Sequence, residues 1–251
     1  MKFSIIIPAF NEEANIASCI VNLDDVLKDY DHEFVVVNDG STDRTGAVLK
    51  GLKKGGLLKI IDRPVGDSGI GKAIKAGILA ATGDFIIVAM ADSSDDPRDA
   101  LQMVQIASKS DVDGVYGTRF SKGGKVSNYP PLKRLVNRLY NHLVSVLLAI
   151  PHDDMSNAFK MYRRQLLQDL DIESNGFDIT IELPVKALLR AKKGIVIIPI
   201  KWKGRKEGQP KWKLLREGVV YLKRLLILYG VVRQEGYREG KTVKRIKNDG
   251  A

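Results

Sequence analysis

The sequence predicts an α/β fold: a mostly parallel sheet with helices on both faces, followed by a C-terminal amphipathic helix. Two observations predict it. Apolar, β-rich runs alternate with helical patterns through the first half of the chain. Polar and acidic residues then follow several of these runs, as expected where the parallel strands of such a sheet end.

The predicted strands of the first half are 3–7, 34–37, 58–61, 85–88 and 112–116, and the predicted helices are 14–27, 45–53, 72–81 and 100–107. Strands separated by helices pair in parallel through right-handed crossovers. A Gly/Ser/Lys loop at 121–127 and Pro130–Pro131 then change the pattern. The second half predicts helices at 132–149, 179–190 and 213–232, with strands at 158–162 and 194–200.

The composition is that of a globular protein with an anionic partner. The 251 residues are 44% hydrophobic and 28% charged, with a formal net charge of +10. This excess of base indicates a nucleotide, a nucleic acid or an anionic membrane surface. One cysteine, Cys19, excludes an intrachain disulfide and fits a reducing compartment. No apolar run reaches the ~18 residues that a membrane span requires.

Carboxylates follow three of the predicted strands. Glu12, Asp39 and Asp92 come after strands whose carboxyl ends share one edge of the sheet, where α/β proteins bind ligands. Asp92 is the strongest candidate for a metal ligand, because clustered carboxylates hold divalent cations against phosphates. Asp95 and Ser94 are further oxygen donors. Taken singly, such residues are also helix caps and turns, and Asp96–Pro97 matches a helix N-cap.

Cations gather in the second half of the chain. Arg119 follows the strand 112–116, and Arg134 and Arg138 lie one turn apart on a predicted helix. Arg205 and Lys211 flank Gly208 in the loop before the last helix. Guanidinium groups bind phosphate in a bidentate way, so these residues are candidate phosphate clamps. For any one of them the alternative is a solvated surface charge.

Taken in order, these motifs resemble family 2 glycosyltransferases of the GT-A fold, and most closely their dolichyl-phosphate mannose synthase or polyprenyl-phosphate glycosyltransferase branch. The matching segments are Pro8–Glu13, Asn38–Asp43, Asp92–Pro97, Gly117–Phe120 with Gly123–Gly124, Asp154–Lys160 and Arg205–Gly208. Met90 stands where the branch usually has the first acid of Asp-x-Asp, and Ser94 where it commonly has Gln. Asn157-Ala158-Phe159-Lys160 replaces Ser-Gly-Phe-Arg, and Pro210 replaces a Ser.

The resemblance implies a role for each of these residues. Donor nucleotide binding falls to Pro8, Phe10, Glu12, Val37 and Asp39, and a Mg²⁺ or Mn²⁺ ion to Asp92, Ser94 and Asp95. Asp92, Arg119 and Arg205 are the implied catalytic residues, and Arg134, Arg138 and Lys211 the implied contacts of the acceptor phosphate. The implied domain is 1–232, with a nucleotide-binding half (1–118), an acceptor half (119–212) and the helix 213–232. A basic tail, 233–251, is expected to be disordered.

The function expected from this resemblance is an inverting transfer of a hexose from a nucleotide sugar, GDP-mannose or a UDP-hexose, to a polyprenyl phosphate. That acceptor is already ionised and needs no base, so Asp154→Asn should keep activity and Arg134→Ala should lose it. A saccharide hydroxyl acceptor, with Asp154 as its base, is the first alternative. A nucleotidyltransferase is disfavoured because Pro8–Glu13 has no Gly/Arg/Lys phosphate loop. A nucleic-acid binder is disfavoured because the basic residues are spread widely.

The sequence of the last predicted helix indicates where in the cell the protein acts. Leu215, Val219, Leu222, Leu226 and Tyr229 recur at helical spacing, and Arg216, Lys223 and Arg224 add charge. Such a helix can lie on an anionic membrane, or it can pack on the domain or on a second subunit. We expect a cytoplasmic protein associated peripherally with the inner face of the membrane. A homodimer or a separate membrane-anchor subunit would also cover the helix.

Overall fold

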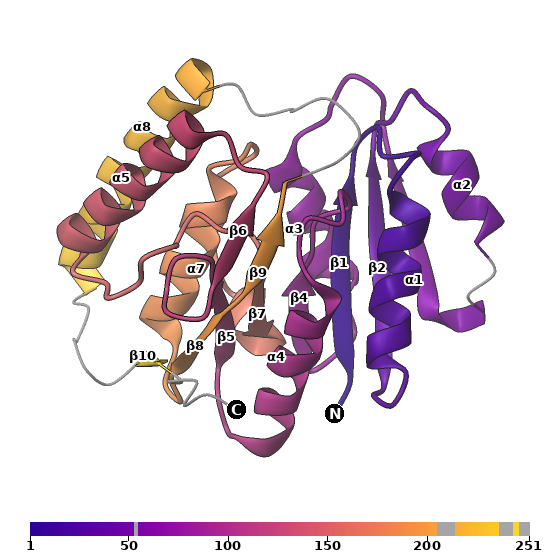
Figure 1. The fold of residues 1–251 in the computed structure, drawn as a ribbon, viewed down its shortest axis with the longest axis horizontal. Helices are drawn as coiled ribbons and strands as arrows, with labels where there is room; N and C mark the ends of the chain where they lie inside the picture. The colour runs from indigo at the N-terminus through magenta and orange to yellow at the C-terminus, as the bar shows by residue number, and fades with distance from the viewer. Residues whose placement is uncertain (53–54, 205–213, 236–242, 246–251) are drawn as a thin grey trace.

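The central feature of the fold is an eight-stranded sheet (Figure 1). The computed structural model describes residues 1–52, 55–204, 214–235 and 243–245. The strand order is β10-β8-β5-β7-β4-β1-β2-β3. The bounds are β1 (Phe3–Ala9), β2 (His32–Asp39), β3 (Leu58–Arg63), β4 (Phe85–Val88), β5 (Gly114–Thr118), β7 (Lys160–Arg163), β8 (Ile195–Pro199) and β10 (Val243–Arg245).

All neighbouring strands of this sheet pair in parallel except β7, which is antiparallel to both β4 and β5. The parallel pairs confirm the predicted topology. Parallel strands buried on both faces need apolar residues at consecutive positions, and β1 (FSIIIPA) is buried along its whole length. The carboxyl ends of β1, β2 and β4 therefore lie together at one edge of the sheet.

Helices cover both faces of the sheet, as predicted. One core lies between the sheet and the helices α1 (Ile16–Leu27), α2 (Thr45–Gly51) and α4 (Pro97–Lys109). A second core lies on the opposite face, against α3 (Ile70–Ala80), α5 (Pro131–Leu148), α6 (Arg164–Gln168), α7 (Ile179–Arg190) and α8 (Leu214–Glu235). The helices α5 and α8 lie side by side (Figure 1).

Helix α8 has two apolar faces. Tyr221, Leu225, Leu228 and Val232 are buried against the domain. The predicted stripe lies on another face, where Val219, Leu222 and Leu226 are 55%, 48% and 68% exposed. The helix thus packs on the domain and still presents an apolar surface.

One charge that we assigned to the surface of α8 is placed differently by the structure. The guanidinium of Arg224 is largely buried and pairs with Asp178 and Glu173, at 3.1 and 2.9 Å. It fastens α8 to the segment before α7, so it is not a cation offered to a membrane. The reason is helical geometry, because Arg224 lies between the buried and the exposed face of the helix.

Short elements complete the fold. The strands β6 (Lys125–Ser127) and β9 (Lys201–Lys203) pair in a separate two-stranded sheet, and η1 (Gly55–Leu57) is a 3₁₀ turn. Within the tail that we expected to be disordered, Val243–Arg245 forms β10 and pairs with β8. Among the described residues, no helix has the length and apolar character needed to cross a bilayer.

Candidate active site

A pocket of about 980 Å³ opens at the carboxyl edge of the sheet. It is lined by residues from the ends of β1, β2 and β4, from the segments after β5 and before β7, and from α5 and α8. Glu12, Asp39 and Asp92, which we expected to converge, all line this pocket. Pro8 and Phe10 line it too, whereas Val37 is buried within β2 and does not.

Asp39 is held in place by two partners. Its carboxylate accepts a hydrogen bond from the Gly69 backbone N–H at 2.7 Å and pairs with the guanidinium of Arg63. Arg63 in turn reaches Asp67 at 2.8 Å. Sequence analysis missed Arg63, because the end of β3 carries no motif of its own. This network of hydrogen bonds and ion pairs fixes the Asp39 carboxylate in the wall of the pocket.

The glycines at the start of α3 serve packing against a neighbouring loop. A Cβ atom at either Gly69 or Gly71 would lie 2.5 Å from a backbone oxygen of the loop 174–175. The Gly71 N–H donates to the Asn175 carbonyl at 3.0 Å. These glycines allow α3 and that loop to approach closely. Of the two, only Gly69 lines the pocket.

The loop after β4 is tightly shaped. The Ser94 N–H donates to the Asp92 carboxylate at 3.1 Å, and Ser93 between them has a φ of 54°. Asp96 accepts from the Arg98 N–H at 3.0 Å, which confirms the N-cap expected before Pro97. Strand β9 runs beside this loop, where the Lys203 N–H donates to the Ser94 carbonyl at 2.8 Å.

The side chain of Asp95 is suited to a cation. Both of its carboxylate oxygens are buried and have no hydrogen-bond partner among the described residues. Burial, reinforced by the nearby Asp92, raises the pKa of Asp95 to about 7. A buried carboxylate without a partner is costly unless a positive charge balances it. Asp92, Ser94 and Asp95 all line the pocket, so this oxygen donor set fits a divalent cation.

The described residues contain no group of three or more His, Cys, Asp or Glu side chains arranged as a metal site. Two carboxylates, Asp92 and Asp95, are what this loop offers. Mg²⁺ is commonly bound through one or two carboxylates together with substrate phosphates. The donor set therefore fits a cation that is held jointly by the protein and a bound diphosphate.

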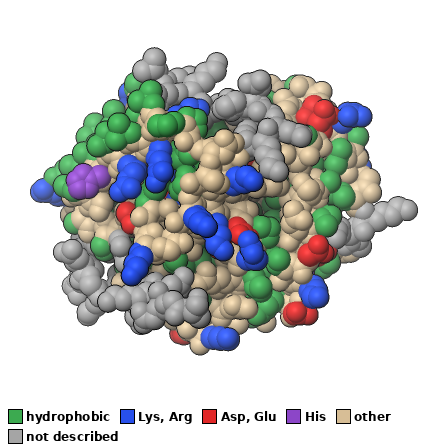
Figure 2. All heavy atoms as spheres, in the orientation of Figure 1, with side chains coloured by type: hydrophobic (Ala, Val, Ile, Leu, Met, Phe, Trp, Pro, Cys, Tyr) green, Lys and Arg blue, Asp and Glu red, His purple; other side chains and the backbone are tan. Residues whose placement is uncertain are grey.

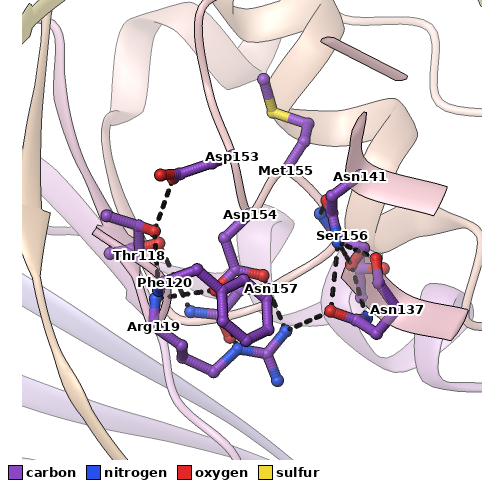
Figure 3. Close-up of polar contacts among 12 residues, drawn as sticks. Thr118, Arg119, Phe120, Asn137, Asn141, Asp153, Asp154, Met155, Ser156 and Asn157 are labelled. Carbon is purple, nitrogen blue, oxygen red and sulfur yellow. Dashed lines mark hydrogen bonds and ion pairs between the residues drawn. The ribbon is translucent and has the colours of Figure 1, made fainter. Parts of the chain in front are cut away.

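Arg119 is a basic residue in the wall of the pocket, and Figure 3 shows its guanidinium beside Asp154 and Asn137. Its Nε and Nη2 atoms donate to the two carboxylate oxygens of Asp154 at 2.8 and 2.7 Å. Its backbone N–H donates to the same carboxylate at 2.8 Å. The aromatic rings of Phe120, Tyr129 and Trp202 lie 5.2–5.9 Å from the guanidinium carbon. Arg119 is therefore a fixed, permanently charged group.

The pairing argues against Asp154 as a base. Its side chain is fully buried and does not line the pocket. Although burial opposes it, the charge and hydrogen bonds of Arg119 hold the pKa of Asp154 below its ordinary value. A carboxylate in this state accepts a proton poorly. The structure thus disfavours the saccharide-acceptor alternative that relied on it.

Helix α5 presents Lys133, Val136, Asn137 and Tyr140 to the pocket. Arg134 and Arg138 are exposed on this helix and do not line it, and the Arg138 guanidinium lies 5.4 Å from the Phe120 ring centre. One step along a helix turns the side chain by about 100°, so neighbours face different ways. Arg205 and Lys211 lie outside the described residues.

Sequence analysis missed several lining residues, chiefly Lys133, Asn137, Tyr140 and Ser156. A signal was present in the helix itself. Lys133, Asn137, Tyr140 and Val144 recur at spacings of three and four, which marks one face of α5. The sequence analysis had instead selected Arg134 and Arg138, which lie on another face of this helix.

Comparison with known proteins identifies the family. Residues 4–171 match the sequence profile described as Glycosyl transferase family 2. The chain belongs to this family. Its motifs had indicated both the family and the branch, and the names of its relatives agree.

Three curated relatives belong to that branch. A dolichol-phosphate mannosyltransferase of Pyrococcus furiosus is 28% identical over 94% of this chain, and the alignment spans 65% of that longer protein. A polyprenol monophosphomannose synthase of Mycolicibacterium smegmatis is 27% identical, with 82% of this chain and 79% of the relative covered. An undecaprenyl-phosphate mannosyltransferase of Micrococcus luteus is 26% identical, with 89% and 93% covered.

Solved structures confirm the GT-A fold. Glucosyl-3-phosphoglycerate synthase from Mycobacterium tuberculosis, bound to phosphoglyceric acid, superposes with a TM-score of 0.71 at 19% identity, covering 91% of this chain and 80% of the other. A structure of that enzyme with Mn²⁺, uridine diphosphate and phosphoglyceric acid gives a TM-score of 0.68 at 19% identity, with 95% and 80% covered. These likenesses concern the fold.

Proposed function

We propose that this protein transfers a hexose from a nucleotide-diphosphate sugar to a polyprenyl phosphate at a membrane surface, with inversion at the anomeric carbon. One observation carries the proposal. A single pocket is lined by the carboxylates of Glu12, Asp39, Asp92 and Asp95, by the fixed guanidinium of Arg119, by Lys133 and by further residues of α5 and α8. The names of the relatives, all of them mannosyltransferases or mannose synthases that name a lipid phosphate, support the same reaction.

The donor belongs beside the carboxylates of the pocket. Phe10 offers a ring for the base, and Glu12 and Asp39 offer acceptors for hydroxyl or base N–H groups. Asp92 and Asp95 with Ser94 would hold a Mg²⁺ or Mn²⁺ ion there. When bound, such an ion stabilises the negative charge that grows on the departing nucleoside diphosphate. Arg119 adds a second, permanent positive charge to the same pocket.

The acceptor belongs beside the basic and apolar residues of the same pocket. Lys133 and Arg119 supply cations for a phosphate, and Val136, Tyr140 and Tyr221 supply apolar surface for the adjoining isoprenoid. A phosphate monoester is largely ionised near pH 7, since its second pKa is about 6. It attacks without help from a base, so the burial of Asp154 in its ion pair is compatible with this acceptor.

A surface that we call the α5/α8 apolar face supports the membrane part of this proposal. It consists of Leu132, Leu135, Leu139, Leu143 and Val146 of α5 and Val219, Leu222, Leu226 and Ile227 of α8, each 38–68% exposed. Figure 2 shows hydrophobic side chains gathered where α5 and α8 lie, with Lys and Arg beside them. Exposed patches of this kind mark interaction sites.

The positive charge of α5 favours an anionic lipid surface, over a protein partner, as the group that covers this face. The helix carries Lys133, Arg134 and Arg138 and no acidic residue. On an anionic membrane each cation near the surface adds about 1 kcal/mol of binding free energy. Arg134 and Arg138, which do not line the pocket, then serve to hold the helix on the headgroups.

A binding screen tests the donor half of this proposal. The chain is heated with GDP, UDP, GDP-mannose and UDP-glucose, each with and without Mn²⁺. A specific ligand raises the melting temperature by mass action, and the metal should increase that shift. Equal melting temperatures with all four ligands would contradict the donor assignment.

A further inference from the structure

Ser156 lies in the loop before β7, beside Asn137 and Asn141 (Figure 3). It lines the pocket and is partly exposed. Two asparagines of α5 surround its hydroxyl oxygen. The Asn137 Nδ2 atom donates to it at 3.1 Å and the Asn141 Nδ2 atom at 2.9 Å. Asn141 itself is fully buried and does not line the pocket.

The orientations of both amides are fixed by partners that only donate. The Ser156 backbone N–H donates to the Asn141 Oδ1 atom at 3.0 Å, so the Asn141 Nδ2 atom must face the other way. The Arg119 guanidinium donates to the Asn137 Oδ1 atom at 3.4 Å, which turns its Nδ2 atom toward Ser156. Neither amide can flip without losing such a partner.

This arrangement dictates what the Ser156 hydroxyl can do. A hydroxyl has two acceptor lone pairs and one donor hydrogen. Here two N–H donors occupy the lone pairs, so only the O–H hydrogen is left to bind a further group. Among the described residues none accepts it. The hydroxyl is therefore preset as a donor, and the pocket is the space it faces.

We propose that Ser156 donates a hydrogen bond to a phosphate oxygen of the substrate, and that Asn137 and Asn141 are positioning residues that aim it. The inference rests on the proposed function for its ligand. An anionic oxygen is the acceptor that this part of the pocket favours, because the Arg119 guanidinium contacts Asn137 beside Ser156 and Lys133 lines the same pocket. A hydrogen bond to a charged acceptor is among the stronger kinds in proteins.

Calorimetric titration of the full chain tests this inference with two probes, a short water-soluble isoprenyl phosphate and a nucleoside diphosphate with Mn²⁺. Ser156→Ala should weaken isoprenyl phosphate binding about tenfold, the effect of one hydrogen bond to a charged group. Ser156→Thr, which keeps the hydroxyl, should stay within about twofold of the wild type. Asn141→Ala should weaken binding severalfold although Asn141 touches no ligand.

Ser145→Ala is the matched control. Its hydroxyl also fastens α5, by donating to the Ile150 carbonyl at 2.8 Å, but it does not line the pocket. Its loss should lower the melting temperature and leave both dissociation constants unchanged. If Ser156→Ala weakens only the binding of the nucleoside diphosphate, the phosphate that Ser156 contacts is that of the donor. The proposed role of Ser156 as a hydrogen-bond donor then stands.

Equal dissociation constants for Ser156→Ala and the wild type with both probes would overturn the inference. An equally large loss in Ser156→Thr would overturn it too, because the hydroxyl would not be the cause. Failure of the proposed function looks different. In that case the wild type transfers no hexose to the isoprenyl phosphate, while the nucleoside diphosphate titration still tests Ser156.

Discussion

Arg119 and Asp154 form a bidentate ion pair in which both side chains are almost completely buried, with N–O distances of 2.7 and 2.8 Å. The pair joins the end of β5 to the loop before β7. Arg119 places a permanent positive charge in the pocket wall, and the buried carboxylate of Asp154 balances that charge. Because the two residues depend on each other, their substitutions distinguish a structural pair from a catalytic base.

Asp154→Asn should lower the free energy of unfolding by about 3–5 kcal/mol, because it leaves a buried guanidinium uncompensated. Chemical denaturation measures this. Replacing both partners, as Arg119→Met with Asp154→Leu, should recover much of the stability and none of the transferase activity. A stable Asp154→Asn protein that has lost most of its activity and the acid limb of its pH–rate profile would instead indicate a base.

Lys133 and Arg134 are neighbours with different expected roles. Lys133→Ala should raise the Michaelis constant for an isoprenyl phosphate about tenfold, since it removes a phosphate contact from the pocket. Arg134→Ala should leave that constant unchanged in detergent and reduce binding to anionic vesicles. Steady-state kinetics and vesicle sedimentation separate the two. Reversed effects would return the acceptor site to Arg134, as the sequence alone had predicted.

Asp95 should contribute to metal binding. Asp95→Asn keeps the shape of the side chain and removes its charge, so Mn²⁺ should bind about tenfold more weakly in the presence of a nucleoside diphosphate. Titration followed by the electron paramagnetic resonance of Mn²⁺ measures the affinity. Asp96→Asn is the control, because Asp96 caps α4 and does not line the pocket. Unchanged affinity in Asp95→Asn would exclude the residue as a ligand.

The α5/α8 apolar face should carry membrane binding. Leu139→Glu with Leu226→Glu places two charges at positions that are 60% and 68% exposed, so folding should be unaffected. Flotation with anionic liposomes should fall to background because the charges oppose insertion. Leu79→Glu, at an 87% exposed leucine of α3, is the control and should float like the wild type. Undiminished flotation of the double variant would assign the face to a protein partner.

Glu33 should make stability depend on pH in the acid range. Although burial opposes it, hydrogen bonds from Ser4, Thr82 and Lys2 lower the pKa of Glu33 to about 2. The folded pKa lies below the unfolded value of about 4.5, so this stabilisation is complete above pH 4.5 and lost as the pH falls toward 2. In acid denaturation, Glu33→Gln should make the free energy of unfolding less dependent on pH. Glu13→Gln, which removes the more exposed ion pair with Arg44, should leave that dependence unchanged.

The sheet and its ligand-binding edge could be predicted because apolar strands and the residues that follow them are adjacent in the sequence. Asp39 ends its strand and Glu12 and Asp92 lie within four residues of theirs, and the parallel topology brings the three to one pocket. Asp96 was also predictable, since a helix cap depends only on its near neighbours.

The second half of the site depends on long-range contacts and was less predictable. Which face of α5 turns inward is decided by packing on α8 and on the loop before β7, so Lys133 was missed in favour of Arg134. The burial of Arg224 depends on acidic residues about 50 positions away in the sequence. Arg119 likewise pairs with Asp154, which is 35 positions away. No local pattern encodes these partners.

The central claim is that one pocket holds a sugar donor beside its carboxylates and a lipid phosphate beside its basic residues. The most direct test is to incubate the chain with radiolabelled GDP-mannose or UDP-glucose, Mn²⁺ and an isoprenyl phosphate, and to count label in the organic phase. We predict organic-soluble label from one of the two donors, and almost none with Asp92→Asn. Label that stays in the aqueous phase with the wild type, or organic label undiminished by Asp92→Asn, would contradict the claim.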